Sequence, residues 1–465
     1  MTSDDPLNPL EAITPVDGRY RESLRECSRY FSEHALIRYR LFVEVRFLHA
    51  FLEAIGWRGN LLKLEALARN VLEMPVSDAE EVKQLEKKLG HDVAAATSYL
   101  EKRLDQLSLS ELKPFVHFGL TSEDVNNVAY SLMAKSFINE TYIPEMLKLV
   151  ETLTDLAEKH RSTAFLARTH GQPAVPTTFG SYIANYAYRL ASLVSKLKNI
   201  KLQAKLGGAV GDLSSLKTTY PEVDWLAFAE RFVNSFGLEH TPAATQILPH
   251  ERMSELLNTI ASANTLTANL CRDMWILGSL GLVAFSKHAA EVHSSTMPQK
   301  RNPLLFENAE GALDLSTSML SYMSTRLISS RLHRDLSDSI IKRFYGTALA
   351  LSLLGVKNTY RALAEVYVNT EAMRKEVETH KHAIMLEAVQ LMLRKHGVED
   401  GYKIAAEAAE KGSEWLEQQL KKLGKDPTTI IKTTDHYIQA AAEKTTFLLN
   451  KTRNILSYLG NQLPR

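Results

Sequence analysis

Cysteine is almost absent from this chain. Its 465 residues include two cysteines, Cys27 and Cys271. Two are too few for a disulfide framework or for a zinc site built from thiolates. Such scarcity is typical of proteins from a reducing compartment, so we predict a cytoplasmic protein.

An excess of charge of either sign is absent too. Lys plus Arg number 55 and Asp plus Glu number 54, which gives a formal net charge of +1. No overall field therefore attracts the chain to nucleic acid or to an anionic membrane. Any phosphate site must be local, built from a few arginines and helix ends.

Long apolar runs are lacking as well. The longest covers residues 274–285, which is too short to cross a bilayer. The N-terminal segment MTSDDPLNPLEA is acidic and lacks the apolar core of a signal peptide. We therefore expect a soluble protein without a membrane partner.

Proline is missing from long parts of the chain. None lies between Pro176 and Pro221, between Pro249 and Pro298, or between Pro303 and Pro427. These stretches are rich in strong helix formers, and their apolar residues recur at helical spacing. Alternating strand patterns are scarce. The sequence predicts an all-α protein with several long central helices.

The helical pattern weakens near residues 109–114 and 368–372. We predict three helical domains, an N-terminal one over residues 1–112, a central long-helix bundle over 113–368 and a C-terminal one over 369–465. Long helices that are apolar on more than one stripe need partners on several sides, which favours association of identical subunits.

One loop combines groups that suit an anionic substrate. The segment Ser294–Pro303 reads SSTMPQKRNP and holds two adjacent hydroxyls, the cations Lys300 and Arg301, and the amide Asn302. Its prolines exclude a helix interior. Such a loop can fold over an anion and bring a serine to it. A solvated linker between helices is the alternative.

A second irregular segment, RTHGQP, carries His170 on a predicted turn between two helices. A histidine on a turn can donate or accept a proton near neutral pH, as general acid–base catalysis requires. A structural histidine is the alternative.

Two predicted helix ends carry polar groups. Thr121 is the predicted N-cap of a helix, with Asp124 in capping-box position. Thr121, Ser122 and the first-turn N–H groups then form an end that can receive an anion; a plain cap is the alternative. Gly90 is predicted to end a helix, which places His91–Asp92 just beyond it, where a solvated charge pair is the alternative.

Several arginines occur in two further polar segments. The turn PVDGRY ends in Arg19 and Tyr20. Arg334, Ser339 and Arg343 are predicted to lie on one helix. Ion pairing at the surface is the simpler explanation of these arginines.

Two further patterns are not assigned to sites. The glycine-rich segment 207–211 lacks the lysine and the preceding strand of a phosphate-binding loop. His380 and His382 face apart on a predicted helix. We therefore predict no metal site.

The segments PVDGRY, HD, TSEDVNN, RTHGQPA, ATQILPH and SSTMPQKRNP occur in this order. Together they resemble the adenylosuccinate lyase family of the fumarase/aspartase superfamily. The resemblance extends from Pro15 into the 340s, and the C-terminal part is the least diagnostic. Fumarases and argininosuccinate lyases share the last segment but lack PVDGRY and TSEDVNN.

This resemblance implies three helical domains, with five long helices per subunit forming a twenty-helix core in a homotetramer. Each active site would draw residues from three subunits. The implied reaction is β-elimination of fumarate from adenylosuccinate and from succinyl-carboxamide imidazole ribotide, in purine synthesis. The ligands would be these small nucleotides, with no nucleic acid partner. Neither a metal nor an organic cofactor is implied, because both chemical steps are proton transfers.

The resemblance also implies roles for individual residues. His170 would be the general acid and Ser294 the base, although the residues alone do not settle which group is acid and which is base. Lys300 would stabilise charge beside the substrate carboxylate, and Glu307 would orient the histidine. The remaining implied residues bind the nucleotide, the phosphate or the succinyl group: Arg19, Tyr20, His91, Asp92, Thr121, Ser122, Gln246, Ser295, Arg301, Asn302, Asn308, Arg334, Ser339 and Arg343.

Two other functions remain open from the sequence. The chain could be a sister lyase of the superfamily, such as argininosuccinate lyase or fumarase. It could also be a catalytically silent structural protein of the same fold.

Overall fold

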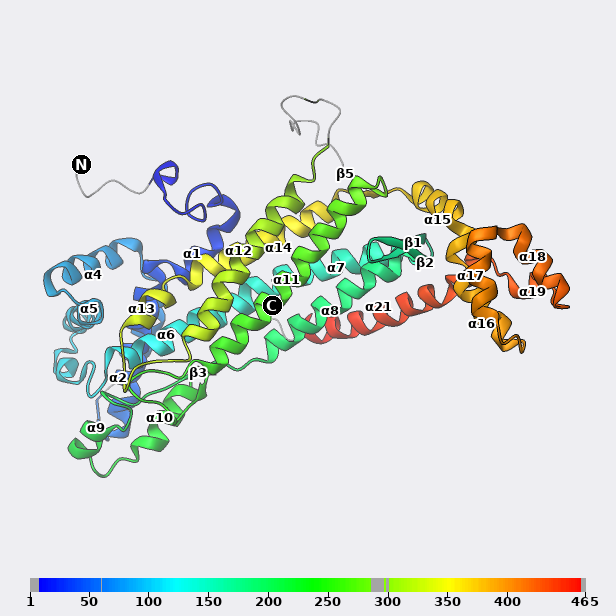
Figure 1. Ribbon diagram of the computed structural model, residues 1–465. Coiled ribbons are helices and arrows are strands. Elements are labelled where there is room, and N and C mark those ends of the chain that lie inside the picture. The colour runs from blue at the N-terminus through cyan, green and yellow to red at the C-terminus, as the bar shows by residue number, and fades with distance from the viewer. Residues whose placement is uncertain (1–7, 60, 286–296, 298–300, 461–465) are drawn as a thin grey trace.

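The computed structural model describes residues 8–59, 61–285, 297 and 301–460. Its middle is a bundle of long helices that run roughly side by side (Figure 1). The bundle helices are α6 (Ser122–Phe137), α7 (Ile143–Lys159), α8 (Phe179–Asn199), α11 (Glu251–Ser279), α12 (Leu304–Arg326) and α14 (Tyr345–Ala364). Because α8, α11 and α14 occupy the proline-free stretches, the all-α prediction is confirmed.

Helices α6 and α7 form one rod with an irregular joint. A π-helical turn, residues 138–142, joins them, and Pro144 follows it in the first turn of α7. Proline has no N–H to donate to the carbonyl four residues earlier, and its ring crowds that carbonyl. The backbone therefore widens into a π turn immediately before the proline.

Further helices, most of them shorter, build the two ends of the elongated chain (Figure 1). One end holds α1 (Ser28–Phe31), α2 (Glu33–Ala54), α3 (Leu62–Leu72), α4 (Val76–Leu89) and α5 (Asp92–Gln106), with α9 (Ser214–Thr219), α10 (Trp225–Asn234) and α13 (Ser337–Lys342) nearby. The other end holds α15 (Thr370–Ile384), α16 (Leu386–Lys395), α17 (Gly401–Lys411), α18 (Ser413–Lys422), α19 (Pro427–Ile430) and α20 (Thr434–Tyr437). The last helix, α21 (Gln439–Gly460), returns to the bundle and packs along α8.

Buried apolar side chains form separate clusters. The largest runs through the bundle and includes Phe137 and Tyr345. A second joins α2–α5 around Leu48, and a third joins α16–α19 around Leu393. Each end thus has a core of its own. The domain boundaries after residues 112 and 368 stay predictions.

Three two-stranded ribbons occur among the described residues. They pair β1 (Ala164–Thr169) with β2 (Gln172–Thr178), β3 (Gln203–Ala204) with β4 (Glu239–His240), and β5 (Val283–Phe285) with β6 (Val366–Val368). The pairs β1–β2 and β5–β6 are antiparallel, and β3–β4 is parallel. The sequence predicts only a turn where the β1–β2 hairpin lies.

The prediction that one helix carries Arg334, Ser339 and Arg343 is wrong. Helix α13 begins only at Ser337, and Arg334 lies in the irregular segment before it. The carboxylate of Asp335 accepts hydrogen bonds from the backbone N–H groups of Ser337 and Arg331. A local acceptor of this kind competes with helical hydrogen bonds, so the helix starts later.

One stretch among the described residues, Ser337–Ala364, is long and apolar enough to span a membrane by length and composition alone. However, 61% of its most apolar window is buried inside the protein. Helix α14, which forms most of it, packs against α12 and α7. Its apolar side chains therefore belong to the core of the bundle.

A chain of hydrogen bonds crosses the centre of the bundle. The hydroxyl of Tyr142 lies 2.9 Å from Ser352 Oγ, and Ser352 donates to Asn264 Oδ1 at 2.6 Å. Asn264 Nδ2 donates to Ser316 Oγ at 3.0 Å, and Ser316 donates to the carbonyl of Ala348. All four side chains are at most 1% exposed. Each hydroxyl proton therefore has an acceptor within this buried chain.

Replacing Asn264 by Ala should lower the free energy of unfolding by about 2–3 kcal/mol, because it removes the acceptor of the buried Ser352 hydroxyl proton and the donor to the buried Ser316 oxygen. The measurement is the denaturant midpoint at fixed protein concentration. The control is Thr446→Ala on the exposed face of α21, which should shift the midpoint little. Equal shifts in the two variants would contradict the role of this chain.

Candidate functional site

The described site residues lie in three regions of the chain. The first, called here the α6–α13 region, contains His91, Asp92, Thr121, Ser122, Gln246, Arg334, Ser339 and Arg343. The second, the α12 region, contains Arg19, Tyr20, Arg301, Asn302, Glu307 and Asn308. The third is the β1–β2 hairpin with His170. Ser294, Ser295 and Lys300 lie outside the described residues.

The α6–α13 region is centred on the N-terminal end of α6. Thr121 is its N-cap, and its N–H donates to Asp124 Oδ2 at 2.9 Å. Asp124 also accepts from Lys205 Nζ at 2.7 Å, from Gly207 N at 2.9 Å and from Gly208 N at 3.0 Å. The glycine-rich segment thus cradles a buried carboxylate of the protein itself. The predicted capping box is confirmed, and it is tied to a distant loop.

Two of these glycines are required by the geometry. Gly208 has φ +68°, in the left-handed region that side chains rarely adopt. Gly211 has φ +103°, and an added Cβ would lie 2.4 Å from the carbonyl oxygen of Ala244. Glycine at 208 therefore allows the turn that donates to Asp124, and glycine at 211 allows the loop to pack against the segment before Gln246.

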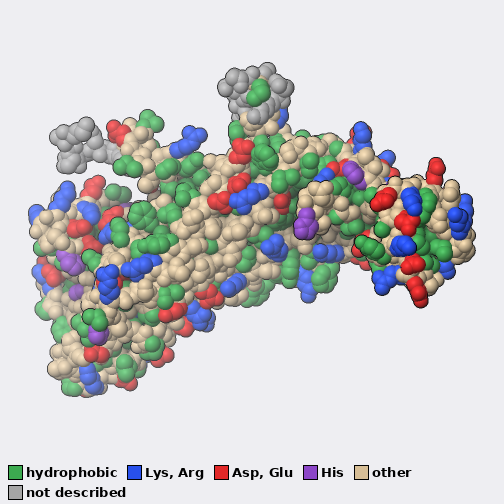
Figure 2. All heavy atoms as spheres, viewed as in Figure 1, with side chains coloured by type: hydrophobic (Ala, Val, Ile, Leu, Met, Phe, Trp, Pro, Cys, Tyr) green, Lys and Arg blue, Asp and Glu red, His purple; other side chains and the backbone are tan. Residues whose placement is uncertain are grey.

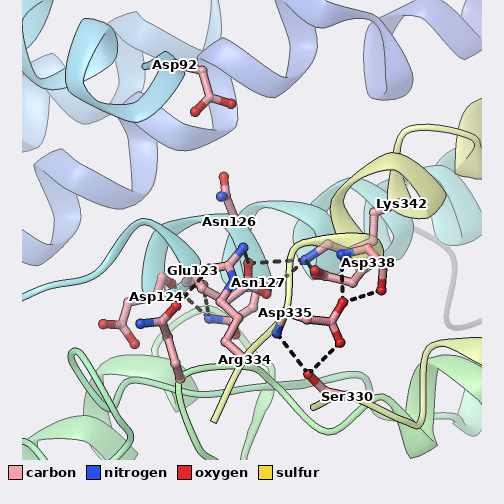
Figure 3. Close-up of polar contacts among 12 residues, drawn as sticks. Asp92, Glu123, Asp124, Asn126, Asn127, Ser330, Arg334, Asp335, Asp338 and Lys342 are labelled. Carbon is pink, nitrogen blue, oxygen red and sulfur yellow. Dashed lines mark hydrogen bonds and ion pairs between the residues drawn. The ribbon is translucent and has the colours of Figure 1, made fainter. Parts of the chain in front are cut away.

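Gln246 and Arg334 adjoin this helix end. Gln246 Nε2 donates to the carbonyl of Ala209 at 2.6 Å, and Arg334 Nη1 donates to Gln246 Oε1 at 3.3 Å. Arg334 Nη2 lies 3.6 Å from the buried carboxylate of Glu123 (Figure 3). The structure therefore brings together Gln246, Arg334 and the first turn of α6, which are far apart in sequence.

Asp92 lies in the same region, at the start of α5. The Arg40 guanidinium donates to Asp92 Oδ2 at 2.6 Å and to Asn126 Oδ1 at 2.8 Å, which ties α5 to α6. Burial by itself would raise the pKa of Asp92, but the charge and hydrogen bond of Arg40 outweigh burial and lower it. Arg343 Nη2 lies 3.4 Å from the same oxygen.

His91 is the N-cap of α5. Its Nδ1 accepts from the Ala94 N–H at 3.3 Å, so the ring proton of the neutral form lies on Nε2. The side chain is 54% exposed. His91 can therefore donate to a ligand bound beside Asp92. The prediction that Gly90 ends α4 is confirmed by its φ of +68°.

The α12 region contains a cleft of about 470 Å³ that residues 301–303, immediately before α12, help to line. Its walls include Trp275, Phe285, Asn302 and Glu307. Glu307 Oε1 accepts from Trp275 Nε1 at 3.2 Å. In the same region Asn308 donates to the hydroxyl of Tyr20 at 2.9 Å and accepts from Asn358.

His170 occupies the tip of the β1–β2 hairpin. Thr169 pairs with Gln172 across the two-residue turn, in which His170 has φ +54° and Gly171 φ +74°. Two consecutive positive φ values are typical of a type I′ turn. Such a conformation is costly for histidine and persists where the surroundings impose it. The imidazole is exposed, as the predicted turn requires.

The hairpin is fixed to helix α15. Arg168 pairs with Glu376 on that helix. Leu166 packs against Val377, Ile384 and Met385. The C-terminal part of the chain thus holds the strand that carries His170.

One chain keeps the three regions apart. The hairpin lies toward the right-hand end of the bundle and α13 toward its left-hand end (Figure 1). Arg343 precedes α14, whereas Asn358, which contacts Asn308, lies 13 residues into that helix from Tyr345, a separation of roughly 20 Å. Residues implied for one active site therefore lie in different parts of a single subunit.

One group of three potential metal ligands occurs in the described part of the chain: Glu123, His250 and Asp338 have ligand atoms within 4.8 Å of one another. Lys342 Nζ lies 2.9 Å from Glu123 Oε1 and 2.6 Å from Asp338 Oδ2. An ammonium group thus takes the place that a metal ion would need, so we assign no metal here.

Sequence reasoning missed several buried partners of the site. Glu123 and Lys342 carry the contacts described above, Arg168 with Glu376 fixes the hairpin, and the buried donors Lys205, Gly207 and Gly208 add to the predicted capping role of Asp124. The only sequence signal was the pair of adjacent acids after Thr121, which capping explains. Their cationic partners are too distant in sequence to be paired without the fold.

A histidine–glutamate pair orders the loop that leads to Thr121. His117 has φ +56°, and its Nδ1 lies 2.6 Å from Oε1 of Glu44, which is 0% exposed and belongs to α2. Burial alone would lower the pKa of His117, but the hydrogen bond and charge of Glu44 outweigh it, so the pKa is raised. The pair connects the N-terminal helices to the first turn of α6.

Two family models match this chain. One, described as lyase, matches residues 18–314, and one described as adenylosuccinate lyase C-terminal matches residues 330–441. The adenylosuccinate lyase of Escherichia coli K12 is 36% identical over 412 residues, covering 85% of this chain and 88% of that protein. The adenylosuccinate lyase of Dictyostelium discoideum is 35% identical over 420 residues, covering 87% and 89%.

Solved structures share the fold at lower identity. A fumarate lyase from Mesorhizobium sp. BNC1 matches with a TM-score of 0.75 and 20% identity, covering 92% of this chain and 97% of that one. A β-carboxy-cis,cis-muconate cycloisomerase from Acinetobacter calcoaceticus matches with a TM-score of 0.72 and 20% identity, covering 93% and 99%. These structures support the long-helix architecture alone.

The ion pair of His117 with Glu44 should make stability depend on pH. Since the folded-state pKa of His117 is raised, its contribution is complete below the unfolded pKa of about 6.5 and is lost as the pH rises through the folded value. The difference in unfolding free energy between the parent and His117→Gln should therefore be larger at pH 6 than at pH 9. Denaturant titrations at both values measure it, and a difference that grows with pH would contradict the pair.

Proposed function

Because this chain belongs to the adenylosuccinate lyase family, we propose that it removes fumarate from adenylosuccinate, which gives AMP. We propose the same β-elimination for succinyl-carboxamide imidazole ribotide, which gives the carboxamide in purine synthesis. The observation that carries the proposal is the identity of about 35% to such lyases over most of the chain. A protein of the same fold without activity and a sister lyase remain as outcomes of the assay.

The reaction needs two proton transfers. A base removes the proton from the carbon beside a carboxylate, and an acid protonates the departing nitrogen. His170 suits the acid, because its imidazole is exposed at the tip of a hairpin that α15 holds in place. Ser294 is the proposed base. Lys300, by analogy with the family, would stabilise the second negative charge that develops beside the carboxylate.

The regions suit different parts of the substrate. In the α6–α13 region Arg334, Ser339 and Arg343 would bind phosphate, since a guanidinium fork matches phosphate oxygens. His91 and Asp92 would adjoin the purine and ribose. Thr121, Ser122 and Gln246 would hold the succinyl group. In the α12 region Asn302, Asn308 and Arg301, together with Ser295, would hold the dicarboxylate. Arg19 and Tyr20 would complete the contacts to phosphate and nucleotide. Glu307 would orient His170.

A homotetramer would join regions that one chain separates. Exposed apolar side chains line the bundle on α11 and α12, among them Trp275, Ile276, Leu315 and Tyr322, each at least 48% exposed. Much of the middle of the bundle carries uncharged surface, whereas charged side chains gather at both ends (Figure 2). Exposed apolar side chains that follow one another along these helices favour a partner. We propose four copies packed through the bundle, with each site drawing on three of them.

The proposed location is the cytoplasm, and the proposed ligands are small nucleotides without nucleic acid or membrane. Both cysteines are buried free thiols, which suits a reducing compartment. The net charge of +1 gives no general attraction to polyanions.

The first test measures fumarate released from adenylosuccinate. The parent should be active, and His170→Gln should lower kcat by roughly 10²–10⁴-fold, the usual effect of removing a general acid. His436→Gln, at an exposed position on α20, is the matched control and should keep full activity. Turnover of argininosuccinate or malate, without turnover of adenylosuccinate, would identify a sister lyase. No turnover of any of the three compounds would indicate a structural protein without activity.

The second test concerns the sharing of sites between subunits. His170→Gln and Ser294→Ala should each be nearly inactive. In hybrids formed by co-expression, half of the subunits carry the native His170 and the other half the native Ser294. If a site takes these two residues from different subunits, about a quarter of the sites contain both, and the hybrids should have about a quarter of the parent activity. Hybrids as inactive as the separate variants would place both residues in one subunit and refute the shared site.

A further inference from the structure

We propose that Glu123 is a positioning residue that aims Arg334 at the substrate, with Lys342 as its fixed counter-charge. This inference rests on the proposed function, because Arg334 matters only if an anionic substrate binds in the α6–α13 region. Glu123 itself is 0% exposed and cannot touch a ligand. Its effect must therefore pass through Arg334.

The carboxylate of Glu123 lies between two cations from one distant segment. Lys342 Nζ donates to Oε1 at 2.9 Å and to Oε2 at 3.2 Å. Arg334 Nη2 lies 3.6 Å from Oε2. The close-up shows Arg334 and Lys342 converging on Glu123 from the segment around α13 (Figure 3). One side chain of α6 thus fixes the placement of both ends of that segment.

The charges of this buried group balance. Glu123 and Asp338 are the carboxylates, and Lys342 and Arg334 are the cations. His250 adjoins them, and burial, together with the charge of Lys342, lowers its pKa to about 3, so its ring is neutral at physiological pH. Lys342 Nζ also lies 2.6 Å from Asp338 Oδ2. Because each buried charge has a counter-charge, the group is stable as a unit, and removing one member leaves another uncompensated.

Arg334 is the one cation of this group that reaches solvent. Its side chain is 18% exposed, whereas that of Lys342 is 2% exposed. Glu123 on one side and Gln246 on the other leave its guanidinium little choice of direction. An arginine that is already held in one rotamer loses less conformational entropy on binding an anion than an arginine that samples several rotamers.

The neighbouring carboxylate has a different task. Among the described residues, the donors to the Asp124 carboxylate are the N-cap of α6 and residues 205–208. None of them is an arginine of the proposed site. The two adjacent acids at the start of α6 therefore have different roles. Asp124 anchors the helix to the glycine-rich loop, and Glu123 orients Arg334.

The test is a double-mutant cycle on adenylosuccinate cleavage. Glu123→Gln keeps the size of the side chain and removes its charge. In the parent background we expect KM to rise about tenfold, with a smaller change in kcat, because Arg334 would bind substrate and transition state alike. In the Arg334→Ala background the same substitution should change KM less than twofold. Glu145→Gln, which removes a carboxylate paired with the exposed Lys148 on α7, is the control and should leave KM unchanged in both backgrounds.

Equal changes of KM in the two backgrounds, or no change in either, would overturn the positioning role while leaving the proposed function intact. An inactive parent protein would instead refute the proposed function. If Glu123→Gln does not fold by circular dichroism, Glu123→Asp replaces it in the same cycle. This variant keeps the charge but withdraws it from Arg334, so the same dependence on Arg334 is expected.

Discussion

The complete burial of the Asp124 carboxylate is the constraint on which the candidate site depends. A buried charge is tolerated only when it is paired and hydrogen-bonded. Asp124 meets this requirement with donors from its own helix end, from Lys205 and from the backbone of Gly207 and Gly208. These donors belong to segments 80 or so residues apart. The start of α6 and the glycine-rich loop are thereby fixed to one another, and Gln246, which donates to the carbonyl of Ala209 in that loop, is fixed with them.

The second constraint is the length of the bundle. Helices such as α11, which runs from Glu251 to Ser279, separate their two ends by about 40 Å at 1.5 Å per residue. Polar segments that follow or precede such helices must therefore lie at different ends of one chain. The same helices expose apolar side chains along their length. Both facts agree with the proposed assembly, in which copies of the chain would pack along the bundle and bring different regions together.

Much of this architecture could be predicted from the sequence. Proline-free stretches and helical periodicity identified the long helices, and the capping box at Thr121 and the helix end at Gly90 were recognised because such signals are local. The β1–β2 hairpin was not predicted, because its strands are short and the sequence indicates only a turn at His170. The irregular segment around Arg334 also escaped, since Asp335 competes with the helix by hydrogen bonds that periodicity does not reveal. The buried ion pairs could not be predicted, because their members meet only in the folded chain.

Two arginines with the same proposed role are held in different ways. Arg343 is exposed, and its partners Glu33 and Asp92 lie 3.1 and 3.4 Å away, 39% and 25% exposed. Ion pairs of this kind contribute little in water, so an incoming phosphate can replace them at small cost. Arg334 faces Glu123, which is buried and cannot leave. The chain thus combines an arginine that can exchange its partners for a ligand with one whose direction is set before the ligand arrives. If both arginines bind the substrate as proposed, a protein with almost no net charge would hold a strongly anionic ligand at one place, because the attraction resides in a few oriented groups.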